Sequence, residues 1–141
     1  MVQKNGLEDY YVIRNQKKLR FGYTTGSCAA GAARGAARLL FGEDEISEVE
    51  LMTPKGILLH LEILDRKRSE NAASCAVRKD AGDDPDTTNG ILVYAKVEKF
   101  LIRSDMEDRI VIDGGIGVGR VTKPGLSQKV GRLRSIRCRE L

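Results

Sequence analysis

Three stretches of the chain combine residue types that could bind a ligand. The first, GYTTGSCAA at 22–30, places hydroxyl groups at the start of a helix-like run. Its candidate ligand-binding residues are Thr24, Thr25, Gly26, Ser27 and Cys28. The free N–H groups and the dipole at a helix start attract carboxylates or phosphates, and they could also lower the pKa of the Cys28 thiol. A plain hydroxyl cap explains the same residues, so both interpretations stay open.

The second stretch, KDAGDDPDTTNG at 79–90, holds four aspartates within seven residues. Carboxylates at this density repel one another, so they need a cation, backbone donors or solvent around them. Their spacing does not fit a calcium loop, which has acids at alternate positions and a later Glu. The pattern indicates a carboxylate site for a cationic ligand or for ribose hydroxyls, or else a solvated turn. The candidate residues are Lys79, Asp80, Asp83, Asp84, Asp86 and Thr88.

The third stretch, DGGIGVGRVTKPGL at 113–126, is rich in glycine, which lets a backbone approach a ligand closely. Its spacing excludes the dinucleotide fingerprint, because Arg120 stands where the last glycine would be. No Gly-Lys-Ser or Gly-Lys-Thr follows, which excludes a P-loop. A turn without a ligand is the other interpretation. The candidate residues are Gly115, Gly117, Gly119, Thr122 and Lys123.

We expect one helix and five or six strands to position these stretches. The Ala- and Gly-rich run from Thr24 to Gly42, with a hydroxyl start and a glycine stop, predicts a helix that packs closely against a sheet. A hairpin is predicted from the strands Val49–Met52 and Ile57–Ile63, followed by a charged loop at Asp65–Asn71. The other predicted strands are Tyr10–Ile13, Ala72–Lys79, Ile91–Val97 and Arg109–Ile112. The fold class is therefore α+β, a mainly antiparallel sheet against that helix. We further expect the three stretches to line one shared cavity.

The composition narrows the classes of function. The 141 residues, 41% hydrophobic and 31% charged, indicate one globular domain with a packed core. Of the net charge of +4, the last ten residues carry +3, and only 5% of residues are aromatic, so we expect no nucleic-acid partner.

Three widely spaced cysteines fit neither disulfides nor a zinc knuckle, and His60 is predicted to be structural. With no leader or membrane-spanning pattern, we expect a cytoplasmic protein without a membrane partner.

In this order, the strings GYTTGSCAA, KDAGDDPDTTNG and GGIGVGRVTKPGL resemble the N-terminal part of the cobalt-precorrin-5B methyltransferase family of anaerobic cobalamin biosynthesis. The resemblance runs from about Leu19 to Gly131. It implies that a methyl group passes from S-adenosylmethionine, the cofactor, to carbon 1 of a cobalt-containing macrocycle, which gives cobalt-precorrin-6A. Displacement at a sulfonium depends mainly on positioning. The resemblance therefore assigns no catalytic side chain and no metal ligand.

The resemblance also suggests roles for the charged residues. The substrate is a cobalt-corrinoid polycarboxylate, which the helix start and the basic residues Arg78, Lys79, Arg120 and Lys123 would contact. The sulfonium, amino group and ribose of the cofactor would be bound by Asp83, Asp84 and Asp86. Asn89 stands where the family usually has a histidine, so acid–base work at that position is in doubt, whereas a positioning role survives.

Family members are much longer and continue into a second α/β domain, whereas this sequence ends in RLRSIRCREL. We expect an N-terminal segment with a short strand at 1–20, the α+β domain at 21–131 and an Arg-rich tail at 132–141. The tail is interpreted as a frameshift product, because permissible codons for the last eleven residues read EAAINPVPRA in another frame. A chain truncated in this way could be inactive.

Two other classes of function stay open at this point. One is a metal-dependent or phosphate-handling enzyme built on the acidic and glycine-rich stretches. The other is a noncatalytic binding module that recruits RNA through the tail, which would show steep salt dependence. Unpaired strand edges also leave self-association as a homo-oligomer open.

Overall fold

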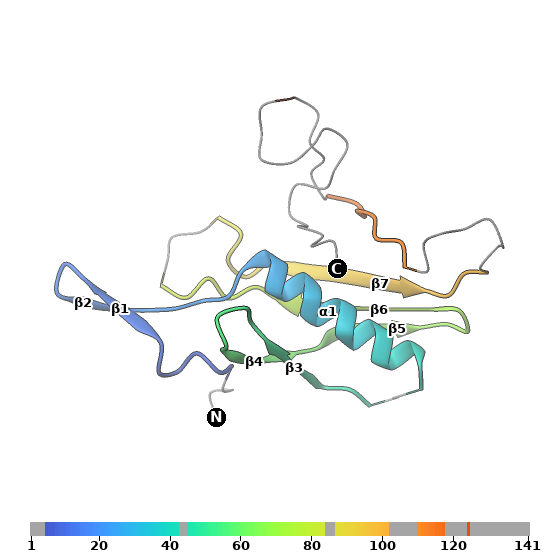
Figure 1. Ribbon diagram of the computed structural model, residues 1–141, viewed down its shortest axis with the longest axis horizontal. Coiled ribbons are helices and arrows are strands. Elements are labelled where there is room, and N and C mark those ends of the chain that lie inside the picture. The colour runs from blue at the N-terminus through green and yellow to red at the C-terminus, as the bar shows by residue number, and fades with distance from the viewer. Residues whose placement is uncertain (1–4, 43–44, 84–86, 102–109, 118–123, 125–141) are drawn as a thin grey trace. The chain divides into compact units, whose positions relative to one another are not determined.

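The computed structural model describes residues 5–42, 45–83, 87–101, 110–117 and 124 (Figure 1). The chain divides into two compact units, Met1–Phe100 and Leu101–Leu141. All the helices and strands of the described residues lie in the first unit. Among the described residues, no helix has both the length and the apolar character needed to cross a bilayer.

The predicted helix is confirmed as α1 (Thr25–Leu40). The Thr24 side chain caps it by accepting a hydrogen bond from the Ser27 N–H at 3.1 Å. After the C-cap residue Phe41, Gly42 adopts a φ of +111°, which a glycine tolerates and other residues rarely adopt. The hydroxyl start and the glycine stop therefore fix the two ends of α1.

The strands of the described residues form three antiparallel sheets, which confirms the α+β class (Figure 1). The first pairs β1 (Tyr11–Arg14) with β2 (Lys17–Arg20), and the second pairs β3 (Glu48–Met52) with β4 (Leu58–Glu62). The third has the order β5 (Leu64–Arg68), β6 (Ala72–Arg78), β7 (Leu92–Glu98). The predicted hairpin is thus β3–β4, and the strands predicted at Tyr10–Ile13, Ala72–Lys79 and Ile91–Val97 correspond to β1, β6 and β7.

The helix packs mainly on β6 and β7 and also contacts β3. A Cβ added at Gly31 would lie 2.4 Å from Leu61 Cδ1, and one at Gly35 would lie 2.9 Å from Ile63 Cδ1. The Cys75 thiol donates a hydrogen bond to the Ala32 carbonyl at 3.0 Å. The small residues therefore permit the close helix–sheet approach that the sequence predicts.

Two predictions about strands were wrong. The segment Asp65–Asn71, which was expected to be a charged loop, contains most of β5. The residues of β5 after Leu64 are exposed, so this edge strand lacks the alternation of apolar and polar residues that indicates a strand in the sequence. Residues 110–112, the described part of the strand expected at Arg109–Ile112, form no strand. The partner of β1, the basic strand β2, was also not expected.

Candidate functional site

The first two chemical stretches meet through their backbones. The Tyr23 N–H donates to the Asp80 carbonyl at 2.8 Å, and the Asp83 N–H donates to the Arg20 carbonyl at 3.0 Å. Phe21 and Gly82 form an isolated antiparallel bridge between these bonds. The chain that enters α1 is therefore joined to the chain that leaves β6.

Two glycines make this close approach possible. A Cβ at Gly22 would lie 2.2 Å from the carbonyl carbon of Ala81 and from the carbonyl oxygen of Asp80. A Cβ at Gly82, whose φ is +66°, would lie 2.3 Å from the Arg20 carbonyl oxygen. No side chain fits at either position, so each stretch contributes the glycine that the other stretch requires.

An ion pair reinforces the junction. Arg20 binds Asp80 through two hydrogen bonds, Nη1 to Oδ2 at 2.7 Å and Nη2 to Oδ1 at 3.0 Å. The Arg20 hydrogen bond lowers the pKa of Asp80, and the same bond raises the pKa of Arg20. Asp80 Oδ1 also accepts the Gly82 N–H at 2.8 Å, and Asp83 Oδ2 accepts the Arg20 N–H at 2.7 Å. Both described aspartates of the acidic stretch thus have partners within the chain.

Asn89 holds the far side of the same loop. Its Oδ1 accepts the Ala81 N–H at 2.9 Å, and the neighbouring Gly90 N–H donates to the Lys79 carbonyl at 2.8 Å. The amide at this position therefore acts as a hydrogen-bond acceptor for the backbone. A role of Asn89 in positioning a ligand stays a prediction.

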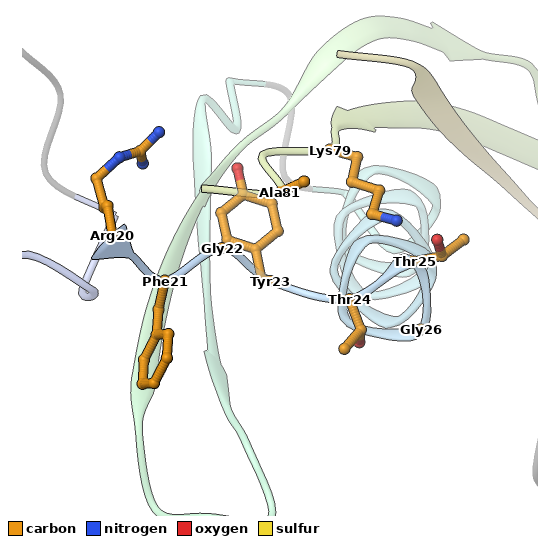
Figure 2. A pocket seen from close by; sticks show the side chains of 9 residues that line it. All are labelled: Arg20, Phe21, Gly22, Tyr23, Thr24, Thr25, Gly26, Lys79 and Ala81. Carbon is orange, nitrogen blue, oxygen red and sulfur yellow. The ribbon is translucent and has the colours of Figure 1, made fainter. Parts of the chain in front are cut away.

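A cavity of about 500 Å³ opens beside the junction, lined by residues 20–26, Lys79 and Ala81 (Figure 2). Its volume falls within the range of roughly 300–1,000 Å³ that is usual for small-molecule sites. Figure 2 shows the Lys79 side chain extending toward the first turn of α1, where Thr25 lies. The cavity thus combines a helix start, hydroxyl groups and an ammonium group.

The polar groups of the cavity are held in defined positions. Lys79 is only 8% exposed, and its Nζ donates to Thr88 Oγ1 at 2.5 Å. The Tyr23 hydroxyl donates to the Arg78 carbonyl at 3.1 Å, and burial raises the Tyr23 pKa to about 12. The tyrosine therefore stays neutral at physiological pH. With a cation and helix N–H groups at its wall, the cavity favours an anion.

The thiol of Cys28 does not have the lowered pKa that a helix start could give it. It is fully buried (0% exposed) in the core beneath the helix start, and burial raises its pKa to about 11. Desolvation of the thiolate outweighs the favourable effects of the Lys79 charge and of the hydrogen bond from the Cys28 backbone N–H. The prediction of a lowered pKa was wrong, and Cys28 is a core residue.

The other predicted residues fall into four groups. Thr24, Thr25, Gly26 and Lys79 line the cavity, whereas Ser27, Asp80, Asp83 and Thr88 support it through the bonds given above. Gly115 and Gly117 belong to the second unit, and Asp84, Asp86, Gly119, Arg120, Thr122, Lys123 and the tail at 132–141 lie outside the described residues. The shared cavity is thus formed by two of the three stretches, and the place of the third stays a prediction.

The sequence interpretation missed the contribution of Arg20, Phe21, Gly22, Tyr23 and Ala81 to the cavity wall. Gly22 and Tyr23 belong to the string GYTTGSCAA. Gly22 was the sequence signal that could have indicated a close approach of two backbones at this point. His60 lies on β4 with its Nδ1 3.1 Å from Glu48 Oε1, and it does not line the cavity. Among the residues that the structure describes, no group of three or more His, Cys, Asp or Glu side chains is arranged to hold a metal ion.

Comparison with known proteins gives consistent matches. The family model named CbiD matches residues 12–136. A protein of Ruminiclostridium cellulolyticum is 51% identical over 121 residues, which cover 86% of this chain and 30% of that protein. A protein of Alkaliphilus metalliredigens is 51% identical over 122 residues, which cover 86% of this chain and 31% of that protein. A protein of Geobacter metallireducens is 52% identical over 118 residues, which cover 83% of this chain and 32% of that protein. All three are named cobalt-precorrin-5B C(1)-methyltransferase, and this chain spans about a third of their length or less. No solved structure matches.

Proposed function

The chain belongs to the CbiD family, and on that premise we propose that it is the N-terminal, substrate-binding part of a methyltransferase that methylates carbon 1 of cobalt-precorrin-5B. S-adenosylmethionine is the proposed methyl donor, since its sulfonium releases a methyl group to a carbon nucleophile. Such a displacement requires the two reactants to be aligned rather than a dedicated acid or base. The contribution assigned to this chain is therefore binding and orientation of the corrinoid.

The observation that carries this proposal is the cavity built where the first two stretches meet. The corrinoid bears several carboxylate side chains, and the cavity offers the ammonium group of Lys79 beside the start of α1. A charge-assisted bond from Lys79, together with helix N–H groups, would hold one such carboxylate. The cavity therefore takes a peripheral carboxylate arm, and the macrocycle itself lies outside it.

The same residues fit S-adenosylmethionine less well. A sulfonium or a ribose calls for available carboxylate oxygens, yet Asp80 is engaged by Arg20 and Gly82, and Asp83 accepts the Arg20 N–H. Lys79 at the cavity wall would also repel a sulfonium. For Asp84 and Asp86, a role in binding the donor stays a prediction. Within the described residues, the proposal assigns the cavity to the substrate and not to the donor.

A binding experiment tests the carboxylate assignment. We expect calorimetry to show that the chain binds cobyrinic acid, a cobalt corrinoid with free carboxylates, and binds its fully esterified form at least about tenfold more weakly. Lys79→Met should weaken binding of the acid by about ten- to a hundredfold, because it removes a charged donor. Lys79→Arg keeps the charge and should retain most of the affinity.

Two results of this titration would contradict the proposed carboxylate site. Equal binding of acid and ester, or an unchanged affinity in a folded Lys79→Met protein, would contradict the carboxylate site. Thermal unfolding of each variant, measured beside the titration, shows whether the protein is folded, because Lys79 is buried.

The reaction itself needs a second assay. We expect labelled methyl groups from S-adenosylmethionine to appear in the corrinoid fraction when cobalt-precorrin-5B is supplied to the Ruminiclostridium cellulolyticum relative, with this chain assayed in parallel. Transfer by the relative alone would assign the chemistry to the portion that this chain does not span. No transfer by either protein would contradict the proposed reaction.

A further inference from the structure

One face of the hairpin β1–β2 carries four apolar side chains and then two basic ones. Side chains alternate between the two faces of a hairpin, so every second residue of each strand lies on the same face. The Phe21 N–H donates to the Tyr10 carbonyl at 3.2 Å, which extends the strand register by one pair. The face, called the Val12 face below, consists of the opposed pairs Tyr10 and Phe21, Val12 and Leu19, and Arg14 and Lys17.

The apolar part of the Val12 face is accessible to a ligand. Tyr10 is 40% exposed, Val12 42% and Phe21 38%. No residue of the hairpin belongs to the buried core cluster that the structure describes. Contiguous exposed apolar side chains mark a surface that binds another molecule. The hairpin therefore offers apolar contact area that the fold itself does not use.

The two basic residues lie at the far end of the Val12 face, beside the turn at Asn15 and Gln16. Figure 1 shows this turn pointing away from the sheets that pack on α1. Both Arg14 and Lys17 are exposed, and within the described part of the chain no acidic side chain forms an ion pair with either of them. Two cations at this end of the hairpin are thus available to an anion.

The near end of the Val12 face borders the cavity, because Phe21 and Lys79 both line it. Figure 2 shows the Phe21 side chain on the opposite side of the backbone from that of Arg20. The ion pair of Arg20 with Asp80 therefore lies off the Val12 face and does not obstruct it. At about 3.3 Å per residue, the four steps from Phe21 to Lys17 span about 13 Å. An apolar surface thus connects the cavity to two exposed cations.

On the basis of the proposed function, which leaves the macrocycle outside the cavity, we propose that the Val12 face binds the corrinoid ring, and that Arg14 and Lys17 bind a second carboxylate arm. A corrinoid is a broad ring with apolar faces and carboxylate arms around its rim. With one arm in the cavity, the ring lies along the apolar residues, and an arm on the opposite rim reaches the turn. Burial of apolar surface stabilises the ring, and charge-assisted bonds hold both arms.

Charge reversal tests the second carboxylate contact. In calorimetry with cobyrinic acid, Arg14→Glu with Lys17→Glu should weaken binding by the whole chain at least about tenfold, because attraction becomes repulsion. The matched control, Lys18→Glu with Lys55→Glu, makes the same change in net charge. Lys18 lies on the opposite face of the hairpin, with its Nζ 3.9 Å from the centre of the Tyr11 ring, and Lys55 is exposed between β3 and β4. At physiological salt, which screens exposed charges beyond roughly 8 Å, the control should keep its affinity within about threefold.

Two neighbouring residues on opposite faces test the apolar contact. Val12→Ser should weaken binding of cobyrinic acid by about three- to tenfold, because it removes apolar surface beneath the ring. Ile13→Ser is the matched control, since Ile13 is 71% exposed on the other face and should leave the affinity unchanged. Thermal unfolding of every variant should match the wild-type protein, because the hairpin contributes nothing to the described core cluster.

The results distinguish this inference from the proposed function. A wild-type chain that does not bind cobyrinic acid would contradict the proposed function and this inference with it. Binding that Lys79→Met weakens, but that the charge-reversed hairpin and Val12→Ser leave intact, would overturn the inference alone. Equal losses in each variant and its control would also overturn it, because they would indicate a general effect of net charge or of hairpin stability.

Discussion

Asp80 illustrates how the chemistry of a single residue differs from its motif. In the sequence it belongs to an acidic cluster that resembles a ligand site, but in the structure its carboxylate is held by Arg20 and by the Gly82 N–H. The two partners are 60 positions apart in the chain, and no local pattern signals such a pair. Lys79, its neighbour, instead extends into the cavity.

The lowered pKa of Asp80 predicts a specific dependence of stability on pH. Its folded pKa lies below the ordinary value of 3.8, so its ionised form stabilises the fold above that value. This contribution is lost as the pH falls through the folded pKa. Because Arg20 is half exposed, we expect Asp80→Asn to lower the free energy of unfolding by only about 0.5–1 kcal/mol at pH 7.

Urea unfolding at several pH values measures this effect. The difference between the wild-type protein and Asp80→Asn should shrink steadily below pH 3.8. Asp9→Asn, at an exposed position, should follow the wild-type protein within about 0.5 kcal/mol throughout. A difference for Asp80→Asn that does not change with pH would show that the ion pair is not its source.

At the scale of elements, the junction between residues 20–23 and 80–83 determines where α1 begins relative to the sheet. The helix and the β3–β4 hairpin could be predicted because their signals are local: a hydroxyl cap, a glycine stop, and a Pro-Gly turn between apolar strands. The strand β5 and the junction could not, because one is polar and the other depends on long-range contacts. Sequence patterns therefore located the pieces of the site but not the contacts that join two of them.

The junction predicts opposite results for two glycine substitutions. Gly22→Ala would bring a Cβ within 2.2 Å of the backbone at Asp80 and Ala81, so the two segments must separate. We expect a loss of about 2 kcal/mol or more in the free energy of unfolding and a weaker affinity for the corrinoid acid. Gly26→Ala is the matched control, because its Cβ would meet Thr24 Oγ1 at an ordinary contact distance of 3.7 Å.

Chemical denaturation of both variants checks this prediction. Gly26→Ala should be neutral or slightly stabilising, because alanine favours a helix more than glycine does. Equal stability of the two alanine variants would contradict the close backbone approach.

At the scale of the whole molecule, the first unit contains its own core. The buried cluster includes residues of α1, β3, β4 and β6 together with Leu7, and every member lies within Met1–Phe100. The second unit contributes no residue to that cluster as far as the structure describes it. The glycine-rich stretch therefore belongs to a separate compact part of the chain.

This arrangement predicts that residues 1–100 fold without the rest. The shortened protein should show a cooperative thermal transition within about 4 °C of the first transition of the whole chain, since that shift corresponds to less than about 1 kcal/mol. Differential scanning calorimetry measures both proteins. A shortened protein without a cooperative transition would show that residues 101–141 are required for the core.

The paired glycines at 22 and 82 have one further consequence. Because both segments are already tied by backbone hydrogen bonds, the proposed anion would meet a backbone whose conformation these bonds hold in place. Under the proposed function, this segment would lose little conformational entropy on binding, so it would hold a single carboxylate more tightly than a loose loop would.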